Sequence, residues 1–418
     1  MRAAIVDADG IAGFLPAALA RHGVESVHVR SDTPNARLVS RPSGLAAEVR
    51  YRGDVPATAA ALRECGVDIV VAGTESGVLL ADALSAELGT PGNGMTRPAA
   101  RRDKHEMAEA VRAAGLANAA SLATGSADEL VAWARRLGEW PVVVKPLASS
   151  GAEQVFFCRS EAEIRAAHAA VLATVTKYGT RNTAVLGQQY LHGQEFFVNT
   201  VSRAGVHHVV EVWRYHKRPV TGDRLMYDYE WPLPVGDPDG QRVAAYALAV
   251  LDALEIRNGA AHTEVMLTAA GPVLVECGAR AGGSHKPSIV SGCLGTDQID
   301  CLALVIARPE ELVEGRLVRQ DPRSHLRYVT LINPRDGGRI GRHPPAPVRA
   351  LGSFLDMVVT APAGRPLPRT VDLATSPGYV YLDSPDPDEV EADYRRLRRL
   401  EQDGLYTEQP EKEGVIYR

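Results

Sequence analysis

The sequence predicts an α/β protein made of three or four lobes. Its 418 residues exceed what a single hydrophobic core usually serves. The first 95 residues alternate apolar strands with amphipathic helices, which is typical of a parallel sheet covered on both faces. Closely spaced apolar strands follow between residues 141 and 276, and the last hundred residues contain many Pro, Gly and Arg.

The N-terminal lobe is predicted from five elements. Strands are expected at Arg2–Asp9, Ser26–Arg30 and Val67–Ala72, and helices at Ile11–Arg21 and Ser76–Leu88. The turns at residues 9–10 and 73–77 follow strand ends, where open parallel sheets bind ligands. Tight turns with helix caps explain the same residues equally well.

The segment from Pro91 to Pro98 is rich in Gly, Pro and Asn and marks a domain boundary. Asp103 is expected to cap a helix at Lys104–Ala114. Further helices are expected at Ala127–Leu137 and Pro387–Gln402. Later strands are expected at Pro141–Lys145, Gln154–Cys158, Ala184–Leu186, Glu195–Ser202, Val206–Trp213, Ala261–Leu267 and Val273–Glu276.

Composition excludes several classes of protein. The net charge of −5 gives no sign of a surface for nucleic acid, and no apolar run approaches the roughly 20 residues of a membrane span. The N-terminus reads as a buried strand rather than a secretory signal. Five scattered cysteines without metal spacing fit free thiols in a reducing compartment. A cytoplasmic protein is therefore expected.

A lysine ends the apolar stretch Val142–Lys145, and a loop of small residues follows it. Burial penalises an ammonium group unless an anion meets it. The small residues of the loop, among them Ser149, Ser150 and Gly151, let backbone N–H groups approach phosphate oxygens. An edge lysine beside a flexible hairpin is the alternative interpretation.

A second polar stretch, from Gln188 to Glu195, lies between two predicted strands. Its backbone can offer hydrogen bonds to an adenine edge, and Glu195 can accept from ribose hydroxyls. Taken alone, the stretch fits an ordinary strand–turn–strand at least as well.

The most specific pattern is a pair of glutamates on a predicted hairpin. Glu264 and Glu276 fall on adjacent antiparallel strands joined by the turn 268–272. Two such carboxylates repel unless a cation lies between them, and Mg²⁺ prefers carboxylate and phosphate oxygens. Arg280 follows in a loop of small residues, where a guanidinium can stabilise a transferring phosphoryl group. The alternative, a surface hairpin, fits poorly because both glutamates follow apolar stretches.

A charged and aromatic segment, residues 215–231, suggests a substrate wall. Arg218 or Lys217 would clamp a carboxylate, and Tyr227 or Trp231 would shape a pocket, although a surface hairpin explains the segment equally well. His285, after the turn 282–283, is also expected to face substrate. The arginines at 395–399 are interpreted as an ion-paired, solvated helix face rather than a nucleic-acid site.

The order of these features resembles the ATP-grasp superfamily over residues 1–305. A lysine at a helix start, a strand lysine before a small-residue loop, a hinge with a later glutamate, and a Glu…Glu…Arg hairpin carry this resemblance. The stretches 72–78, 101–107 and 378–382 are more narrowly similar to L-amino-acid ligases, the dipeptide-forming enzymes of the bacilysin pathway. Carnosine synthase is a relative.

This resemblance implies an ATP-grasp fold with a Rossmann-like domain at 1–97. A central lid domain at 98–186, a catalytic domain at 187–305 and a β-rich extension at 306–418 would follow. The resemblance also implies roles for single residues. ATP would be bound at its phosphates by Lys104 and Lys145, under a covering loop that contains Ser149, Ser150 and Gly151, at adenine by Gln188, Gln189, Tyr190 and Leu191, and at ribose by Glu195. Mg²⁺, or Mn²⁺ as the alternative ion, would be held by Glu264 and Glu276, the reacting phosphate would be contacted by Arg280 and His262, and the substrate by Glu75.

The implied reaction joins the carboxylate of an amino acid to an amino acid or another amine. ATP would give ADP and an acyl phosphate, which the amine attacks with loss of phosphate. Only small-molecule partners are expected, with no nucleic acid and no membrane; a homodimer is common in such families. A γ-glutamyl-type ligase, a carboxylase and a non-catalytic nucleotide-binding protein stay open as alternatives.

The sequence departs from the family in two places. The hinge has Gln188 and Gln189 where many members carry an acidic residue. The common pattern Glu-x-Asn-x-Arg reads Glu276-Cys277-Gly278-Ala279-Arg280, and glycine offers no side-chain ligand. One Mg²⁺ would then lose a ligand or take water in its place.

Overall fold

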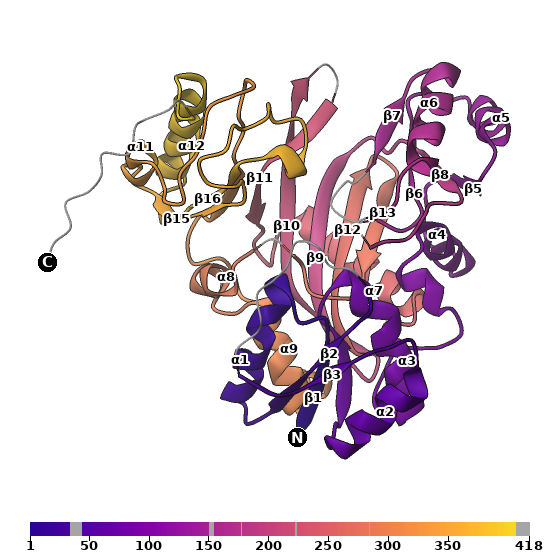
Figure 1. Cartoon of the computed structure of the whole chain (residues 1–418). Helices are drawn as coiled ribbons and strands as arrows, with labels where there is room; N and C mark the ends of the chain where they lie inside the picture. Colours follow the sequence, from indigo (N-terminus) through magenta and orange to yellow (C-terminus); the bar gives the residue numbers. More distant parts are fainter. Residues whose placement is uncertain (34–43, 150–153, 177, 222–223, 284, 407–418) are drawn as a thin grey trace, which may run out of the picture. The chain divides into compact units, whose positions relative to one another are not determined.

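A computed structural model of the chain describes residues 1–33, 44–149, 154–176, 178–221, 224–283 and 285–406 (Figure 1). The chain forms two compact units. Unit 1 comprises Met1–Arg214 with Leu233–Asp321, and unit 2 comprises Tyr215–Pro232 with Pro322–Arg418. The boundaries predicted near residues 97, 186 and 305 are not tested by this division and remain predictions.

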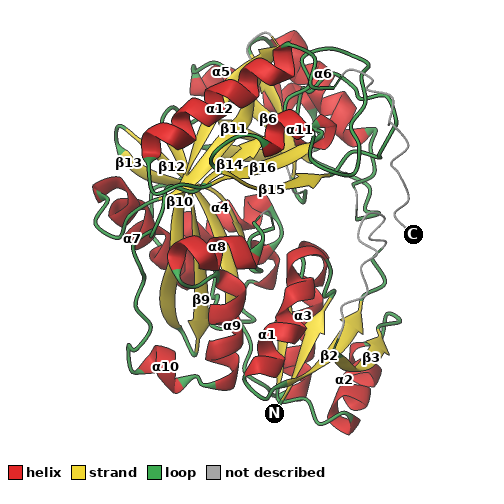
Figure 2. Cartoon of the chain, turned by 90° about the vertical axis from the view of Figure 1, so that its left-hand side faces the viewer, coloured by secondary structure: helices red, strands yellow, loops and turns green. Residues whose placement is uncertain are grey.

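Unit 1 begins with a parallel four-stranded sheet in the order β3-β2-β1-β4. Its elements are β1 Arg2–Val6, β2 Glu25–Arg30, β3 Leu45–Arg50, β4 Ile69–Ala72, α1 Leu15–Arg21, α2 Val55–Glu64 and α3 Val78–Leu88. In β1, Ala3 and Ile5 belong to one buried cluster, whereas Ala4 and Val6 belong to another. Both faces of the sheet are therefore covered, which explains the continuous apolar strands. Helix α1 lies beside α9 (Gln298–Ala307) on one face (Figure 2).

The next part of unit 1 is an antiparallel sheet in the order β5-β8-β6-β7. Its elements are α4 Lys104–Ala113, β5 Ser121–Thr124, α5 Ala127–Leu137, β6 Val142–Pro146, β7 Phe156–Cys158, α6 Glu161–Leu172 and β8 Val185–Gln189. The two helices α5 and α6 start at serine caps, because Ser126 and Ser160 accept from backbone N–H groups of the first turn. The apolar residues of these helices bury Val142 and Val144 of β6.

The last sheet of unit 1 holds the predicted carboxylate hairpin. Its strands run antiparallel in the order β13-β12-β9-β10. The elements are β9 Gln194–Arg203, β10 Val206–Thr221, β12 Gly259–Thr268, β13 Gly271–Gly278, α7 Pro238–Ala253, α8 Pro287–Leu294 and α10 Glu310–Val313. Strand β10 begins in unit 1 and ends in unit 2.

Unit 2 contains the rest of β10 followed in the sheet order by β11, β14, β16 and β15. Its elements are β11 Arg224–Pro232, β14 Arg327–Thr330, α11 Ala346–Arg349, β15 Phe354–Val359, β16 Gly378–Leu382 and α12 Pro387–Gln402. Helix α12 buries Val390 and Leu397 in the same cluster as Val329 and Val380 of the strands. The extension predicted to be β-rich contributes three short strands, β14, β15 and β16, to this sheet order, and α12 has its predicted bounds.

Some elements differ from the sequence-based expectation. The helix predicted at residues 11–21 is a short 3₁₀ helix, Gly10–Phe14, followed by α1. Pro16 lies in the first turn of α1, where its missing N–H removes no hydrogen bond. Strand β3 was not predicted because it alternates half-buried and exposed residues and lies at the sheet edge. Helix α2 was also missed; its sequence is dominated by alanine and its amphipathic pattern is weak.

All five cysteines are free thiols. Among the residues that the structure describes, no single helix is long and apolar enough to cross a membrane. The bent pair α8 and α9 would pass by length and composition alone.

The guanidinium of Arg101 joins helix α3 of the N-terminal lobe to later parts of unit 1. The guanidinium of Arg101 donates to Asp82 at 2.8 Å and to the carbonyl oxygens of Leu254 at 2.9 Å and Gly94 at 2.7 Å. Both charged side chains are almost fully buried. Removing one partner leaves the other charge buried and uncompensated.

We therefore expect Arg101→Met to lower the free energy of unfolding by about 3–5 kcal/mol. Arg63→Met is the matched control, because the Arg63–Glu87 pair is solvent-exposed, and its cost should stay below about 1 kcal/mol. Chemical denaturation of both variants gives the comparison. Equal unfolding midpoints for the two variants would show that the buried pair contributes no special stability.

Candidate active site

Strand β6 carries Lys145 into the interior of unit 1, as the sequence predicts. The whole strand is buried and Lys145 itself is only 6 % exposed. Burial and the positive charge of Lys104 lower the pKa of Lys145 to about 8, against the opposing effect of Glu276, Glu264 and Glu195. A lysine ammonium with a second cation near it can bind phosphate oxygens as a point charge.

Lys104 stands at the first position of α4. The side chain of Asp103 accepts from the backbone N–H groups of His105 and Glu106, so the predicted cap is confirmed. The Lys104 ammonium lies 2.9 Å from Glu276 Oε1 and 3.0 Å from the carbonyl oxygen of Ser149. The helix start, the loop after β6 and strand β13 thus meet at one ammonium group.

The two glutamates lie on adjacent antiparallel strands, as predicted. Glu264 on β12 lies opposite Glu276 on β13, and the register shifts immediately after this pair. His262 Nε2 lies 3.5 Å from Glu264 Oε1. Within the described part of the chain no group of three or more His, Cys, Asp or Glu is arranged to hold a metal ion. A cation at the two glutamates would take its remaining ligands from phosphate or water.

A chain of hydrogen bonds that sequence reasoning missed orients His262. Glu211 accepts from Trp213 Nε1 at 2.7 Å and from Asn199 Nδ2 at 2.8 Å. The amide oxygen of Asn199 then faces His262 Nδ1 at 2.7 Å. Because the amide oxygen can only accept, Nδ1 carries a hydrogen and Nε2 is the atom directed at Glu264. No sequence motif marks this series of hydrogen bonds, since Asn199 and Glu211 lie on different strands.

Arg280 meets Glu75 from the N-terminal sheet. Its Nε lies 2.9 Å from Glu75 Oε2, and Arg102 Nη1 lies 2.6 Å from Glu75 Oε1. Burial would raise the pKa of Glu75, but the charges of Arg280 and Arg102 outweigh it and lower this pKa. Arg102, which sequence reasoning also missed, stacks over the ring of Tyr178 at 4.8 Å. One buried carboxylate therefore holds two guanidinium groups.

The glycine that departs from the family pattern lies beside this carboxylate. A Cβ atom placed on Gly278 would lie 3.1 Å from Glu75 Oε2 and 3.2 Å from Arg280 Cζ. The backbone of Gly278 does not need a positive φ. Its lack of a side chain is thus explained by the space that Glu75 and Arg280 occupy.

The hinge residues lie at the end of β8 and just beyond it. Gln188 is buried opposite Val143 of β6, and Gln189 donates to Glu139 at 2.8 Å. Tyr190 packs edge-on against Phe157, and Leu191 follows it. Glu195 is buried on β9 and contributes to the field at Lys145.

The remaining predicted residues are divided between the two units. Ser149 is buried, whereas Ser150 and Gly151 lie outside the described residues. His285 belongs to unit 1 and stacks on Trp213 with ring centroids 4.2 Å apart. The predicted substrate wall belongs to unit 2, where Lys217 lies over the Tyr227 ring at 4.4 Å and Trp231 contacts Tyr229.

Comparison with known proteins agrees with this geometry. Residues 138–288, which include β6 and both glutamates, match the model of an ATP-grasp domain. The chain is 31 % identical over 406 residues to dapdiamide A synthase of Enterobacter agglomerans, covering 96 % of this chain and 95 % of that protein. It belongs to the ATP-grasp carboxylate–amine ligases. The chain is therefore an enzyme that uses ATP to form an amide bond.

Two further similarities concern amino-acid ligases within the ATP-grasp family. An L-arginine-specific L-amino acid ligase of Bacillus subtilis is 25 % identical over 217 residues, or 52 % of each chain. The crystal structure of an L-amino acid ligase from Bacillus licheniformis superimposes with a TM-score of 0.70 at 19 % identity. It covers 95 % of this chain and 97 % of the other, and shows that both share the ATP-grasp fold.

The pKa of Lys145 leads to a prediction about ATP binding. The ammonium form prevails below a pH of about 8 and is lost above it. Phosphate groups favour the ammonium, so ATP binding should take up a proton at about pH 9 and almost none at about pH 7. Calorimetry in two buffers that differ in ionisation enthalpy measures this uptake.

Two variants control this experiment. Lys145→Arg keeps a permanent charge and should abolish the proton uptake. Lys145→Ala should weaken ATP binding by about tenfold or more, which corresponds to about 1.4 kcal/mol. Unchanged ATP affinity in Lys145→Ala would remove this lysine from the nucleotide site.

The crowding at Gly278 leads to a second prediction. Gly278→Ala should displace Arg280 or Glu75 and lower kcat by about tenfold to a hundredfold, because small misplacements in an active site are costly. Gly283→Ala is the matched control in the same loop, since an added Cβ there meets nothing within 4 Å. Steady-state kinetics of both variants test this prediction. Equal kcat values for the two variants would show that a side chain at position 278 does not disturb Arg280 or Glu75.

Proposed function

We propose that this ATP-grasp ligase activates the carboxylate of an amino acid as an acyl phosphate and joins it to the amine of a second amino acid or another amine. ADP and phosphate would be released. The names of the relatives, which include two L-amino acid ligases, support amino acids as the substrate class. The enzyme class itself rests on the family membership given above.

One observation carries this proposal. Lys104, Lys145 and Arg280 gather beside Glu264 and Glu276, so three cations and two half-buried carboxylates meet in one region of unit 1. In phosphoryl transfer, the protein mainly positions the reactants and neutralises the developing charge. Lys104 and Lys145 would bind ATP phosphates. Arg280 would stabilise the γ-phosphate and then the acyl phosphate.

The glutamate pair fits a hard divalent cation. Carboxylate oxygens on paired strands are ligands that Mg²⁺ accepts, and Mn²⁺ accepts the same donors. Glu264 and Glu276 would hold this ion, which supplies charge neutralisation at the phosphates. Lys104, bonded to Glu276, would link the ion site to the loop that covers the phosphates.

The other predicted residues take supporting roles in this proposal. The hinge would bind adenine through Gln188, Gln189, Tyr190 and Leu191, with Glu195 at the ribose. His262, oriented by Asn199, would direct Nε2 at the reacting groups. Glu75 and His285 would face the amino-acid substrate, and Ser149, Ser150 and Gly151 would cover the phosphates.

A protein nucleophile is not required. Cys277, on β13 beside Glu276, is fully buried, and burial raises the pKa of its thiol to about 12. It therefore stays protonated and unreactive near neutral pH. The substrate carboxylate is the nucleophile of the first step: it attacks the γ-phosphate, the bond to ADP breaks, and the acyl phosphate forms. The amine then attacks the acyl carbon, loses a proton and displaces phosphate.

The proposal predicts ADP and phosphate as products when the enzyme is supplied with ATP, Mg²⁺ and pairs of amino acids. Chromatography of the spent nucleotide, with mass spectrometry of the product, checks this outcome. Glu276→Gln should slow turnover most at limiting Mg²⁺, because it removes one negative charge from the ion site. Arg280→Ala should bind ATP but lower kcat by about 10²–10⁴-fold.

Arg112→Ala is a suitable control, because Arg112 is exposed and, among the described residues, its ion pair is with the neighbouring Glu109. Its activity should equal that of the wild type. Accumulation of AMP and pyrophosphate would contradict the acyl-phosphate mechanism. Full activity in both Glu276→Gln and Arg280→Ala would contradict the assignment of the site.

A further inference from the structure

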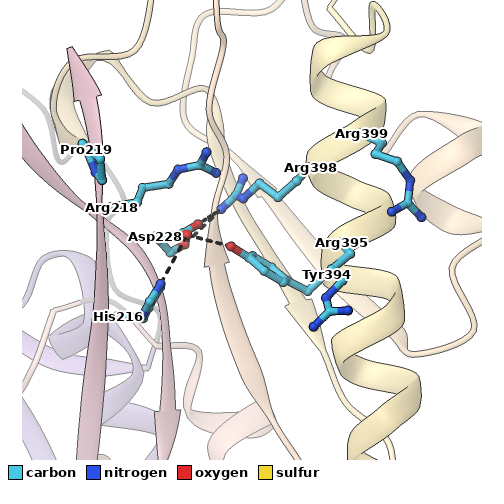
Figure 3. Close-up of a pocket in the computed structure, with 8 residues that line it drawn as sticks. All are labelled: His216, Arg218, Pro219, Asp228, Tyr394, Arg395, Arg398 and Arg399. Carbon is cyan, nitrogen blue, oxygen red and sulfur yellow. Dashed lines mark hydrogen bonds and ion pairs between the residues drawn. The ribbon is translucent and has the colours of Figure 1, made fainter. Parts of the chain in front are cut away.

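Unit 2 contains a basic pocket of about 520 Å³, lined by four arginines and a single aspartate (Figure 3). Two of its walls come from distant segments of the chain. His216 and Arg218 lie two residues apart on β10, on the same side of the strand. Tyr394, Arg395, Arg398 and Arg399 lie on successive turns of α12.

The aspartate of this pocket already has several partners. The carboxylate of Asp228 is buried and accepts from the Tyr394 hydroxyl at 2.6 Å and from Arg398. His216 Nε2 lies 4.0 Å from the same group. Asp228 therefore has little capacity left to compensate a further cation.

The arginines of the pocket differ in their pairing. Arg398 also donates to Glu401 at 2.6 Å and is largely buried, which corrects the prediction of a fully solvated helix face. Arg395 pairs with Glu391 at 2.7 Å, as that prediction requires. For Arg218 and Arg399, the described part of the chain offers no carboxylate within 4.0 Å.

The position of Arg218 shows where charge is left uncompensated. Its guanidinium points toward that of Arg398, above Asp228 (Figure 3). Two guanidinium groups that approach one engaged carboxylate repel each other unless another anion joins them. A planar guanidinium binds carboxylate or phosphate oxygens through two parallel hydrogen bonds.

We propose that this pocket binds a small organic molecule with two or more acidic groups, carboxylates or phosphates, and that Arg218 is its main anchor. The volume favours such a molecule over a single inorganic ion, because binding sites for small molecules usually span about 300–1,000 Å³. Tyr394, His216 and Pro219 also line the pocket, where they can contact the carbon skeleton of the molecule. The sequence analysis predicted that Arg218 clamps a carboxylate, and in this proposal it does so in the pocket of unit 2. The proposal does not depend on the proposed reaction.

Calorimetric titration of the full chain without ATP tests the proposal, with citrate and phosphate as probes at matched ionic strength. The wild type should bind citrate saturably and more tightly than phosphate. Arg218→Gln should weaken citrate binding by about tenfold or more, the loss expected for one bidentate charged contact. Arg399→Gln should weaken it less.

Arg396→Gln is the matched control, because Arg396 is exposed on α12 but does not line the pocket. Its citrate affinity should stay within about twofold of the wild type, the loss of a general electrostatic contribution. An equal loss in Arg218→Gln and Arg396→Gln, or binding without saturation, would overturn the site. Phosphate affinity equal to that of citrate would overturn its assignment to a molecule with several acidic groups.

A variant of the proposed active site separates this inference from the ligase function. Glu276→Gln removes a charge from unit 1 and should leave citrate binding unchanged. Failure of the acyl-phosphate mechanism would therefore not affect the outcome in unit 2, and failure of citrate binding would not affect the proposed reaction.

Discussion

The burial of the Lys145 ammonium is the constraint on which the active region of unit 1 depends. A charge in the interior has to be compensated, and here the compensation comes from carboxylates on other strands. Strands β6, β9, β12 and β13 must therefore be held together closely enough for Glu195, Glu264 and Glu276 to act on it. The hydrogen-bonded sheets hold these strands in place, and the second cation, Lys104, pairs with one of the three carboxylates, Glu276.

In a second buried cluster, a carboxylate from the N-terminal lobe compensates buried cations in the same way. Glu75 starts a short 3₁₀ helix after β4, yet its carboxylate holds both Arg102 and Arg280. Three segments that are remote in sequence are thereby tied to the proposed site of phosphoryl transfer. The glycine at position 278 belongs to the same arrangement, because any side chain there would compete with Glu75 for space.

Unit 2 distributes its buried charges differently. Arg398 lies between Asp228 and Glu401, so the interior of this unit contains two carboxylates around one guanidinium. The surplus of positive charge lies at the pocket, around Arg218, rather than in the core. Helix α12 thus stabilises the extension through Arg398 and Leu397, while Arg395 and Arg399 line the pocket proposed to bind an acidic ligand.

The sequence by itself determined the family and the fold class, because local signals carry that information, and the same signals suggested most of the residues of the proposed site. Apolar periodicity marked most strands, Asp103 marked the start of α4, and the spacing of Glu264, Glu276 and Arg280 marked the hairpin. Only the tertiary structure decided which charges meet. The pairing of Arg102 with Glu75, the hydrogen bonds from Glu211 through Asn199 to His262, and the burial of Arg398 all join residues from separate elements. Such contacts depend on how strands and helices pack in three dimensions, and no local pattern in the sequence encodes them.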